Sequence, residues 1–256
     1  MRRFLLILLI PALLLGYGPD KTRQIDLVHN WTPNPNDQTF LEGALLGPIR
    51  DVMKLKNTIL RTTDLLREEE SPNLVYIVQF NHCPWVKSKH LSKVPQNKRV
   101  LFMWEPPTVQ PKLYSPKFLS QFKRVYTWDD SLVDNKKFFK FYYPELKPLL
   151  PDLPPFHQRK LLTQISGNKK SRHPQELYSE RVNVIRFFEA RPEADFEFYG
   201  FGWEQEGFQN YRGCVDNKLE TLKHYRFSIC YENMRDVHGY ITEKIFDSFA
   251  AGTIPI

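Results

Sequence analysis

A short run near the C-terminal end of the sequence combines residue types that can hold a phosphorylated ligand. Thr242, Glu243 and Lys244 fall inside an apolar stretch, residues 241–251, that predicts a helix. A helix N-terminus offers unpaired N–H groups and a partial positive charge, which favour an anion. Lys244 would add a full charge, and an anion there would relieve its unfavourable place in the first turn. The run therefore indicates a phosphate site, although a solvated Glu-Lys pair on an exposed turn explains the same spacing.

The residues just before this run belong at the end of a strand. The apolar, aromatic residues 225–231 predict a strand, which delivers Glu232 and Asn233 at its carboxyl end. In open α/β sheets, ligands bind at the carboxyl ends of the strands. Gly239 supplies the freedom for a turn between this strand and the helix. The pattern thus places two polar side chains beside the proposed helix start.

The rest of the sequence supplies elements that alternate in type. Apolar runs predict strands at 24–29, 74–80, 99–104 and 122–128, and helical spacing predicts a helix over 38–56. The alternation restarts after residue 159. It predicts strands at 160–166, 195–199 and 253–256 and helices at 174–190 and 215–224. Strands separated by helices are typical of parallel sheets with helices on their faces, so the predicted class is α/β.

Five prolines between residues 143 and 156 mark a joint between two such domains. A proline-rich run is stiff and extended, which suits a linker. The predicted organisation is an N-terminal targeting segment at 1–20, an α/β domain at 21–142, a linker at 143–158 and a second α/β domain at 159–256. Because the sequence stops at the beginning of a strand, the second domain is expected to be incomplete.

The N-terminal segment carries two arginines, Arg2 and Arg3, before about a dozen apolar residues. This pattern predicts a signal peptide or a signal anchor that associates the chain with a membrane, although a hydrophobic first helix of a soluble domain is the alternative. The expected location is the Golgi membrane in a eukaryote, and the inner membrane or cytoplasm in a bacterium.

Composition favours a small phosphorylated ligand over nucleic acid. The chain has 256 residues and a net charge of +7, and its basic residues are scattered rather than clustered. Its three cysteines show no metal-binding spacing. Asp129 and Asp130 are adjacent, whereas metal-dependent sugar transferases use a spaced Asp-x-Asp. We interpret this pair as acids at a helix N-terminus before Ser131.

Three segments resemble the GDP-fucose-dependent α-1,3-fucosyltransferases, glycosyltransferase family ten. The longest match, residues 230–256, reads CYENMRDVHGYITEKIFDSFAAGTIPI. It departs from the family pattern at Tyr231, where Phe is usual, and at Met234, where Ser is usual. A second match reads LLTQISGNKKSRHPQELYSERVNVIRFFE and then DFEFYGFGW. The third is the short motif Trp104-Glu105-Pro106-Pro107.

The resemblance implies a fold and a reaction. The fold would be two Rossmann-like domains that face each other across a cleft, the GT-B type. The reaction would be inverting transfer of L-fucose from GDP-fucose to a glycan hydroxyl, with the 3-hydroxyl of GlcNAc as the expected acceptor. The partners would be GDP-fucose, an N-acetyllactosamine or glycan-core acceptor and a membrane, with no nucleic acid. No cofactor is expected to be required, and a divalent metal ion would at most be stimulatory.

The resemblance also implies roles for individual residues. Glu105 would be the general base, and Arg181 and Lys244 would hold the diphosphate. The other donor contacts would be Asn233, Tyr240 and Glu243. Spacing alone does not separate Arg181 from Arg186 on the same predicted helix. In the same way, Lys169, Lys170 and Arg172 suit a solvated loop as well as a phosphate site.

Two other functions fit the same sequence. A related transferase would use another GDP-sugar, because residues that hold phosphate do not read the sugar. A non-catalytic, truncated nucleotide- or glycan-binding remnant would keep the binding residues without transfer.

Overall fold

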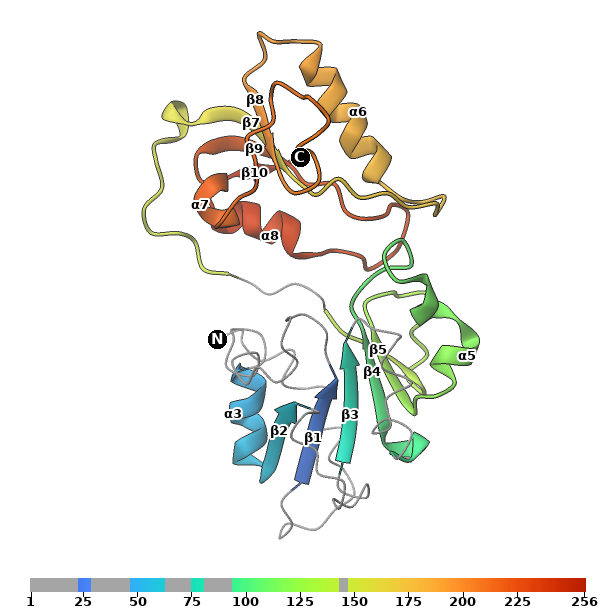
Figure 1. The fold of residues 1–256 in the computed structure, drawn as a ribbon. Coiled ribbons are helices and arrows are strands. Elements are labelled where there is room, and N and C mark those ends of the chain that lie inside the picture. Colours follow the sequence, from blue (N-terminus) through green and yellow to red (C-terminus); the bar gives the residue numbers. More distant parts are fainter. Residues whose placement is uncertain (1–22, 29–46, 63–74, 81–93, 143–146) are drawn as a thin grey trace. The chain divides into compact units, whose positions relative to one another are not determined.

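The computed structural model describes residues 23–28, 47–62, 75–80, 94–142 and 147–256. The chain forms two compact units, Met1–Tyr142 and Tyr143–Ile256 (Figure 1). The predicted targeting segment at 1–20 lies outside the described residues. Within the described ranges, no helix has the length and apolar character needed to cross a membrane.

Unit 1 contains a six-stranded sheet in the order β2-β1-β3-β4-β5-β6, and all of its neighbouring strands are parallel. Its strands are β1 (Arg23–Val28), β2 (Thr58–Thr62), β3 (Val75–Phe80), β4 (Arg99–Met103), β5 (Arg124–Thr127) and β6 (Phe138–Lys140). Its described helices are α3 (Gly47–Leu55) and α5 (Pro116–Leu119), with short 3₁₀ turns η5 (Gln96–Lys98) and η6 (Pro111–Tyr114). Strands β2 and β6 were not predicted.

Both faces of strand β4 are covered, as its unbroken apolar run requires. Leu101 and Met103 lie on one face and join a buried cluster with Val125 and the hydrophobic residues of 113–122. On the other face, Phe102 stacks on Tyr126 of the neighbouring strand with their ring centroids 4.7 Å apart. Alternate side chains therefore serve two cores, and the strand end is held firmly between them.

The interpretation of Asp129 and Asp130 as helix N-terminal acids is wrong. These residues lie in a turn, where Oδ1 of Asp129 accepts hydrogen bonds from the backbone N (2.9 Å) and Oγ (2.6 Å) of Ser131. Asp130 pairs with Lys140, Nζ to Oδ1, at 2.6 Å. An Asp side chain readily closes such a local turn in place of a helix.

Unit 2 contains a four-stranded parallel sheet in the order β10-β9-β7-β8. Its strands are β7 (Lys160–Ile165), β8 (Phe196–Tyr199), β9 (Tyr225–Ile229) and β10 (Ile254–Pro255). Its helices are α6 (Tyr178–Glu189), α7 (Lys218–Leu222) and α8 (Glu243–Ala250), with a 3₁₀ turn η7 (Phe156–Gln158). The core beside α6 is built around Ile185, Phe198 and Trp203. The parallel sheets of the two units confirm the predicted α/β class.

Helix α6 begins four residues later than predicted, at Tyr178 rather than at residue 174. The reason is Glu176, whose Oε2 accepts the backbone N–H groups of Tyr178 (2.6 Å) and Ser179 (3.0 Å). These are N–H groups of the first helical turn, which have no partner within the helix itself. The residues before Glu176 are thereby left free to pair with another loop.

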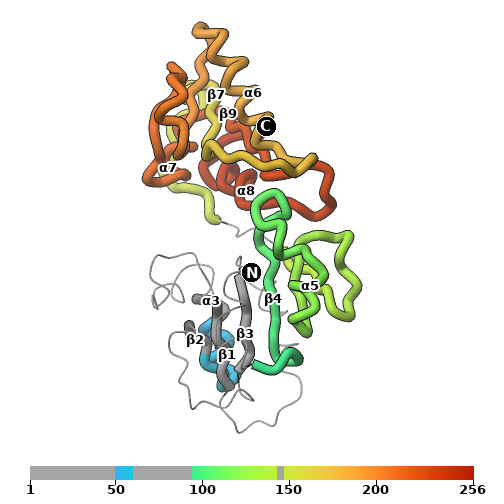
Figure 2. The backbone as a smooth tube through the Cα atoms, turned by 45° about the vertical axis from the view of Figure 1, so that its right-hand side comes forward, coloured from blue at the N-terminus to red at the C-terminus, as the bar shows by residue number. Residues whose placement is uncertain are grey.

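The described part of the proline-rich segment, residues 147–158, belongs to unit 2, and its path can be followed in Figure 2. Lys147 pairs with Asp247 of α8 at 2.7 Å, and the backbone N of Leu150 donates to the carbonyl of Ala250 at 2.8 Å. Arg159 donates to the carbonyls of Pro154 (2.8 Å) and Gly252 (2.5 Å). The segment is therefore fastened to α8 and to the turn that follows it.

Candidate functional site

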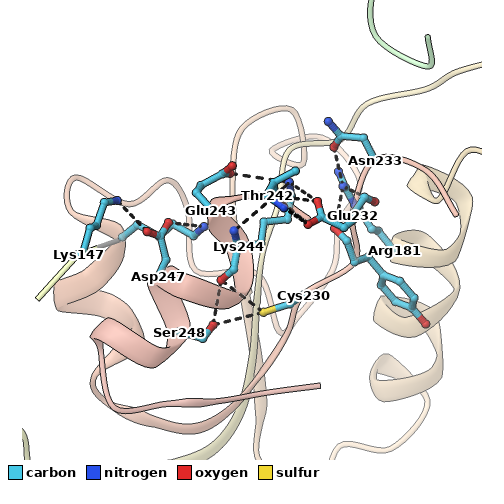
Figure 3. Close-up of polar contacts among 12 residues, drawn as sticks. Lys147, Arg181, Cys230, Glu232, Asn233, Thr242, Glu243, Lys244, Asp247 and Ser248 are labelled. Atoms are coloured by element: carbon cyan, nitrogen blue, oxygen red, sulfur yellow. Dashed lines mark hydrogen bonds and ion pairs between the residues drawn. The ribbon is translucent and has the colours of Figure 1, made fainter. Parts of the chain in front are cut away.

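Polar side chains gather in unit 2 where strand β9 ends and helix α8 begins. Figure 3 shows Arg181 from α6, Glu232 and Asn233 from the loop after β9, and Glu243 and Lys244 from the first turn of α8. Residues more than 50 positions apart in the sequence are thus brought together at the carboxyl edge of the sheet. This is the edge at which parallel α/β sheets bind ligands.

Backbone pairing between two loops brings α6 to this edge. Glu176 and Met234 form an isolated antiparallel bridge. On either side of it, the backbone N of Leu177 donates to the carbonyl of Asn233 (3.3 Å), and that of Arg235 donates to the carbonyl of Gln175 (2.9 Å). The chain that leads into α6 therefore lies along the chain that leaves β9.

Arg181 is buried, with 4% of its surface exposed. Its Nη2 donates to the carbonyls of Tyr231 (3.0 Å) and Glu232 (2.9 Å) and to Oδ1 of Asn233 (2.9 Å). Its Nε is buried and has no hydrogen-bond partner among the residues described. Burial lowers the pKa of Arg181, because desolvation disfavours the charged form. A bound anion would offset that cost.

Lys244 is held by two oxygens. Its Nζ lies 2.9 Å from Oε2 of Glu232 and 2.9 Å from Oγ1 of Thr242, and its distance to Oε1 of Glu243 is 3.7 Å. Thr242 is the N-cap residue of α8, and its Oγ1 accepts from the backbone N of Lys244 at 3.4 Å. The alternative of a simple solvated Glu243–Lys244 pair does not describe this arrangement, since the closer partners of Lys244 are Glu232 and Thr242.

The sequence placed Glu232 and Thr242 beside the start of the helix, but it gave neither of them a role in binding. The Glu232 carboxylate accepts hydrogen bonds from the backbone N and Oγ1 of Thr242, each at 2.8 Å from Oε1. The sequence signal was available, because Glu232 immediately precedes Asn233 and Thr242 occupies a typical N-cap position. Their contact across nine intervening residues depends on the fold.

The other predicted donor residues also lie in this region. Tyr240 is buried and precedes α8 by three residues, after a turn in which Gly239 has φ +84°. Glu243 is the first residue of α8, and 39% of its side chain is exposed. By contrast, Arg186 is exposed on α6, and Lys169, Lys170 and Arg172 are exposed in their loop.

Glu105 lies in unit 1, two residues after the end of β4, and is half-buried. One half-buried side chain, Tyr114, and one buried side chain, Trp128, fix the backbone at this point. The hydroxyl of Tyr114 donates to the carbonyl of Glu105 at 3.1 Å, and Nε1 of Trp128 donates to the carbonyl of Trp104 at 3.0 Å. A carboxylate at a firmly held strand end is suited to accept a proton from a positioned group.

The chemistry open to the unit 2 site follows from its charges. Two cations and a helix N-terminus suit an anion with several oxygens, such as a diphosphate. A partly exposed carboxylate, Glu243, can accept hydrogen bonds from neutral hydroxyl groups. Among the residues described, no group of three or more His, Cys, Asp or Glu side chains could hold a metal ion.

Comparisons with known proteins add to this geometry. A stretch of 42 residues, 16% of this chain, is 50% identical to the alpha-(1,3)-fucosyltransferase FucT of Helicobacter pylori and covers 9% of it. A putative fucosyltransferase-like protein of Arabidopsis thaliana is 42% identical over 53 residues, 18% of this chain and 10% of that protein. The matches therefore span about a tenth of these curated relatives. A solved glycosyltransferase from Rickettsia africae ESF-5 superposes with a TM-score of 0.45 at 10% identity, covering 92% of this chain and 79% of its own.

A family comparison covers the whole of the candidate site in unit 2. Residues 157–256 match the family described as glycosyltransferase family 10 (fucosyltransferase) C-term. The matched range contains Arg181, Glu232, Asn233, Tyr240 and the first turn of α8. Residues 157–256 of this chain are therefore similar to the C-terminal region of glycosyltransferase family 10, the fucosyltransferases, and over this range the resemblance seen in the sequence is confirmed.

Proposed function

We propose that this chain is part of a fucosyltransferase that moves L-fucose from GDP-fucose to a hydroxyl group of a glycan. The observation that carries the proposal is the meeting of Arg181 and Lys244 at the N-terminus of α8, within a region that matches the fucosyltransferase family. Both cations are bound to the same residue, Glu232, so their spacing is fixed before any ligand arrives.

In the proposed reaction these cations act on the leaving group. Cleavage of the bond between fucose and GDP develops negative charge on the diphosphate. Fixed cations stabilise that charge without having to reorganise, and such stabilisation is usually the largest contribution to the rate enhancement of an enzyme. Asn233, Tyr240 and Glu243 complete the donor site in this proposal, with Glu243 accepting hydrogen bonds from the ribose. Because Arg181 and Lys244 supply the positive charge, the proposed reaction requires no metal ion.

Glu105 is the proposed general base. It would take the proton of the acceptor hydroxyl, the 3-hydroxyl of GlcNAc, as that oxygen attacks the anomeric carbon of fucose. Attack from the face opposite the leaving GDP inverts the configuration, as in inverting glycosidases with a sugar hydroxyl in place of water. The half-buried position of Glu105 at the end of β4 supports this role.

Binding of GDP tests the donor half of the proposal. We expect isothermal titration calorimetry to detect GDP binding to the chain, and Lys244→Met to weaken it by about 10- to 100-fold, the value of a charge-assisted hydrogen bond. Lys223→Met is the matched control, because Lys223 forms an ion pair with Glu220 on α7 rather than at the site. Unchanged affinity in Lys244→Met would contradict the proposal.

Transfer of labelled fucose tests the catalytic half. A Glu105→Gln variant is expected to lose about 10²- to 10⁴-fold in transfer to N-acetyllactosamine while its GDP affinity stays the same. Normal transfer by this variant would exclude Glu105 as the base. GDP binding without any transfer in the unmodified chain would instead favour a binding remnant, and competition by another GDP-sugar would favour a related donor.

A further inference from the structure

We propose that Glu232 is a positioning residue that sets the place and direction of the Lys244 ammonium for the diphosphate. This inference rests on the proposed function, because it gives Lys244 the diphosphate as its ligand. Glu232 follows the end of β9 by three residues, so its backbone is anchored to the sheet rather than to α8. It can therefore fix the start of α8 from outside the helix.

The contacts of Glu232 form a closed set with Thr242 and Lys244. The carboxylate accepts from the backbone N of Thr242 (2.8 Å), from Oγ1 of Thr242 (2.8 Å to each oxygen) and from Nζ of Lys244 (2.9 Å). Oγ1 of Thr242 lies 2.9 Å from the same Nζ. Glu232 thus holds Lys244 by two routes, one direct and one through Thr242.

The same residue also contacts the second cation of the site. The backbone carbonyl of Glu232 accepts from Nη2 of Arg181 at 2.9 Å. One residue therefore joins the guanidinium through its backbone and the ammonium through its side chain. The distance between the two cations is then determined by residue 232 and not by two flexible side chains.

Burial makes this arrangement stiff. The side chains of Glu232 and Lys244 are 17% and 20% exposed, and Thr242 is 1% exposed. An exposed lysine samples many rotamers and gains little from one ion pair. Here the surrounding protein removes most of those rotamers, so the two hydrogen bonds can define one direction.

The geometry leaves Lys244 with capacity for a ligand. An ammonium group has three N–H donors. Glu232 and Thr242 each take one, and Oε1 of Glu243, at 3.7 Å, lies beyond hydrogen-bond distance. The remaining donor can serve a phosphate oxygen without displacing Glu232, which would stay in place throughout the reaction.

The direction of the change in GDP affinity separates the proposed positioning role of Glu232 from a simple effect of its charge. A carboxylate near a diphosphate repels it, so removal of the negative charge alone should strengthen GDP binding. If Glu232 instead positions Lys244, removal of its charge should weaken GDP binding, because the ammonium is no longer directed at the phosphate. The two explanations therefore predict opposite changes for Glu232→Gln.

The experiment is a double-mutant cycle on GDP affinity, measured by calorimetry. We expect Glu232→Gln to weaken GDP binding about tenfold in the unmodified chain. In a Lys244→Met background it should cause no further weakening, because the effects of two coupled residues on affinity are not additive. Equal or tighter binding by Glu232→Gln, or the same loss in both backgrounds, would overturn the inference. Glu197→Gln is the matched control, since that residue also pairs with a lysine of unit 2 but lies away from the site.

Two further measurements protect the test from a folding defect. Thr242→Val keeps the shape of the side chain but removes the second route to Lys244, and we expect it to weaken GDP binding about threefold, whereas no change would count against the inference. In the ligand-free chain, the ¹⁵N signal of the Lys244 ammonium should be visible by NMR because its exchange is slow, and it should disappear in Glu232→Gln. A chain that does not bind GDP contradicts the proposed function itself, whereas GDP binding that Glu232→Gln leaves intact contradicts only the role of Glu232.

Discussion

Two of the glutamates of unit 2 that pair with a lysine, Glu197 and Glu232, lie at opposite ends of the same sheet. Glu197, near the start of β8, accepts from Lys160 (2.6 Å), from Arg212 (2.8 Å) and from the hydroxyl of Tyr225. Glu232, beyond the end of β9, accepts from Lys244 and Thr242. The residue types are nearly the same, so composition does not explain why only one cluster resembles a binding site.

The difference lies in the cations. Lys160 and Arg212 have side chains that are 51% and 42% exposed, so water can reach their remaining donors. At the other cluster Arg181 is buried, and its Nε has no partner in the described part of the chain. A cation that water cannot reach needs a ligand to complete its hydrogen bonding, whereas an exposed cation does not. A buried cation that keeps an unpaired donor, rather than a cation as such, therefore distinguishes this cluster from the ion pairs of Glu197.

The largest expected effect on stability is at Glu197, the glutamate whose ion pairs are structural. Burial alone would raise the pKa of Glu197, but hydrogen bonds from Lys160, Tyr225 and Arg212 lower it to about 2. The folded pKa lies below the ordinary value of 4.5, so the cluster contributes stability above that value and loses it as the pH falls from 4.5 towards 2. We expect Glu197→Gln to lower the free energy of unfolding by about 3 kcal/mol at pH 7.

Denaturant unfolding at several pH values would measure this effect. The variant should lose the part of the acid dependence that lies between pH 4.5 and 2, because its residue 197 does not titrate. Its folded fraction should bind GDP with unchanged affinity. A clear loss of GDP affinity would mean that the two clusters are not independent.

A third carboxylate, Asp247, lies on α8, the helix that carries Lys244, and we expect its ion pairs to stabilise the fold without contributing to GDP binding. It is buried on α8 and pairs with Lys147 at 2.7 Å and Lys218 at 2.9 Å. We expect Asp247→Asn to lower the free energy of unfolding by about 2 kcal/mol, because two charge-assisted hydrogen bonds are lost. The loss stays below that of a fully buried pair, since both lysines can turn to water. Thermal unfolding with and without GDP would show whether the effect is confined to stability, and a variant as stable as the unmodified chain would contradict it.

The smallest expected effect concerns the helix that carries Arg181. Burial would raise the pKa of Glu176, but hydrogen bonds from the Ser179 side chain and from the backbone of Ser179 and Tyr178 lower it. Its stabilising effect is therefore present above the ordinary value of 4.5 and is lost as the pH falls below that value. Glu176→Gln should lower the free energy of unfolding by about 1 kcal/mol, which is typical of a lost helix cap. Faster hydrogen exchange at the amides of Tyr178 and Ser179 would reveal it, and unchanged exchange would show that the cap is not important.

The sequence predicted the elements that have strong apolar runs and missed those that depend on contacts. Strands β4, β7 and β9 were predicted within two residues of their bounds, because their runs are long and buried. Strand β6 has three residues and pairs only along β5, so no periodic pattern marked it. The late start of α6 depends on hydrogen bonds from its first turn to the side chain of Glu176, which apolar periodicity does not show.

The site residues divide in the same way, into those that a local motif marks and those that only contacts in the fold reveal. Arg181, Asn233, Tyr240, Glu243 and Lys244 could be named because they lie in recognisable motifs. Glu232 was placed at the end of the strand but was given no role, since its importance arises from contacts with Thr242 and with both cations. The pairing of Asp247 with Lys147 spans 100 residues and has no local signal.

The fastening of residues 147–159 to α8 has a mechanical consequence. The helix has eight residues and is about 12 Å long, so it moves as one rod. One end carries Lys244, and the ion pair with Lys147 and the bond to Leu150 grip it farther along. Any displacement of Lys244 is thus transmitted through α8 to the backbone at residues 147–150. Binding of a ligand at the site should therefore change the rate at which a protease cuts near residue 147.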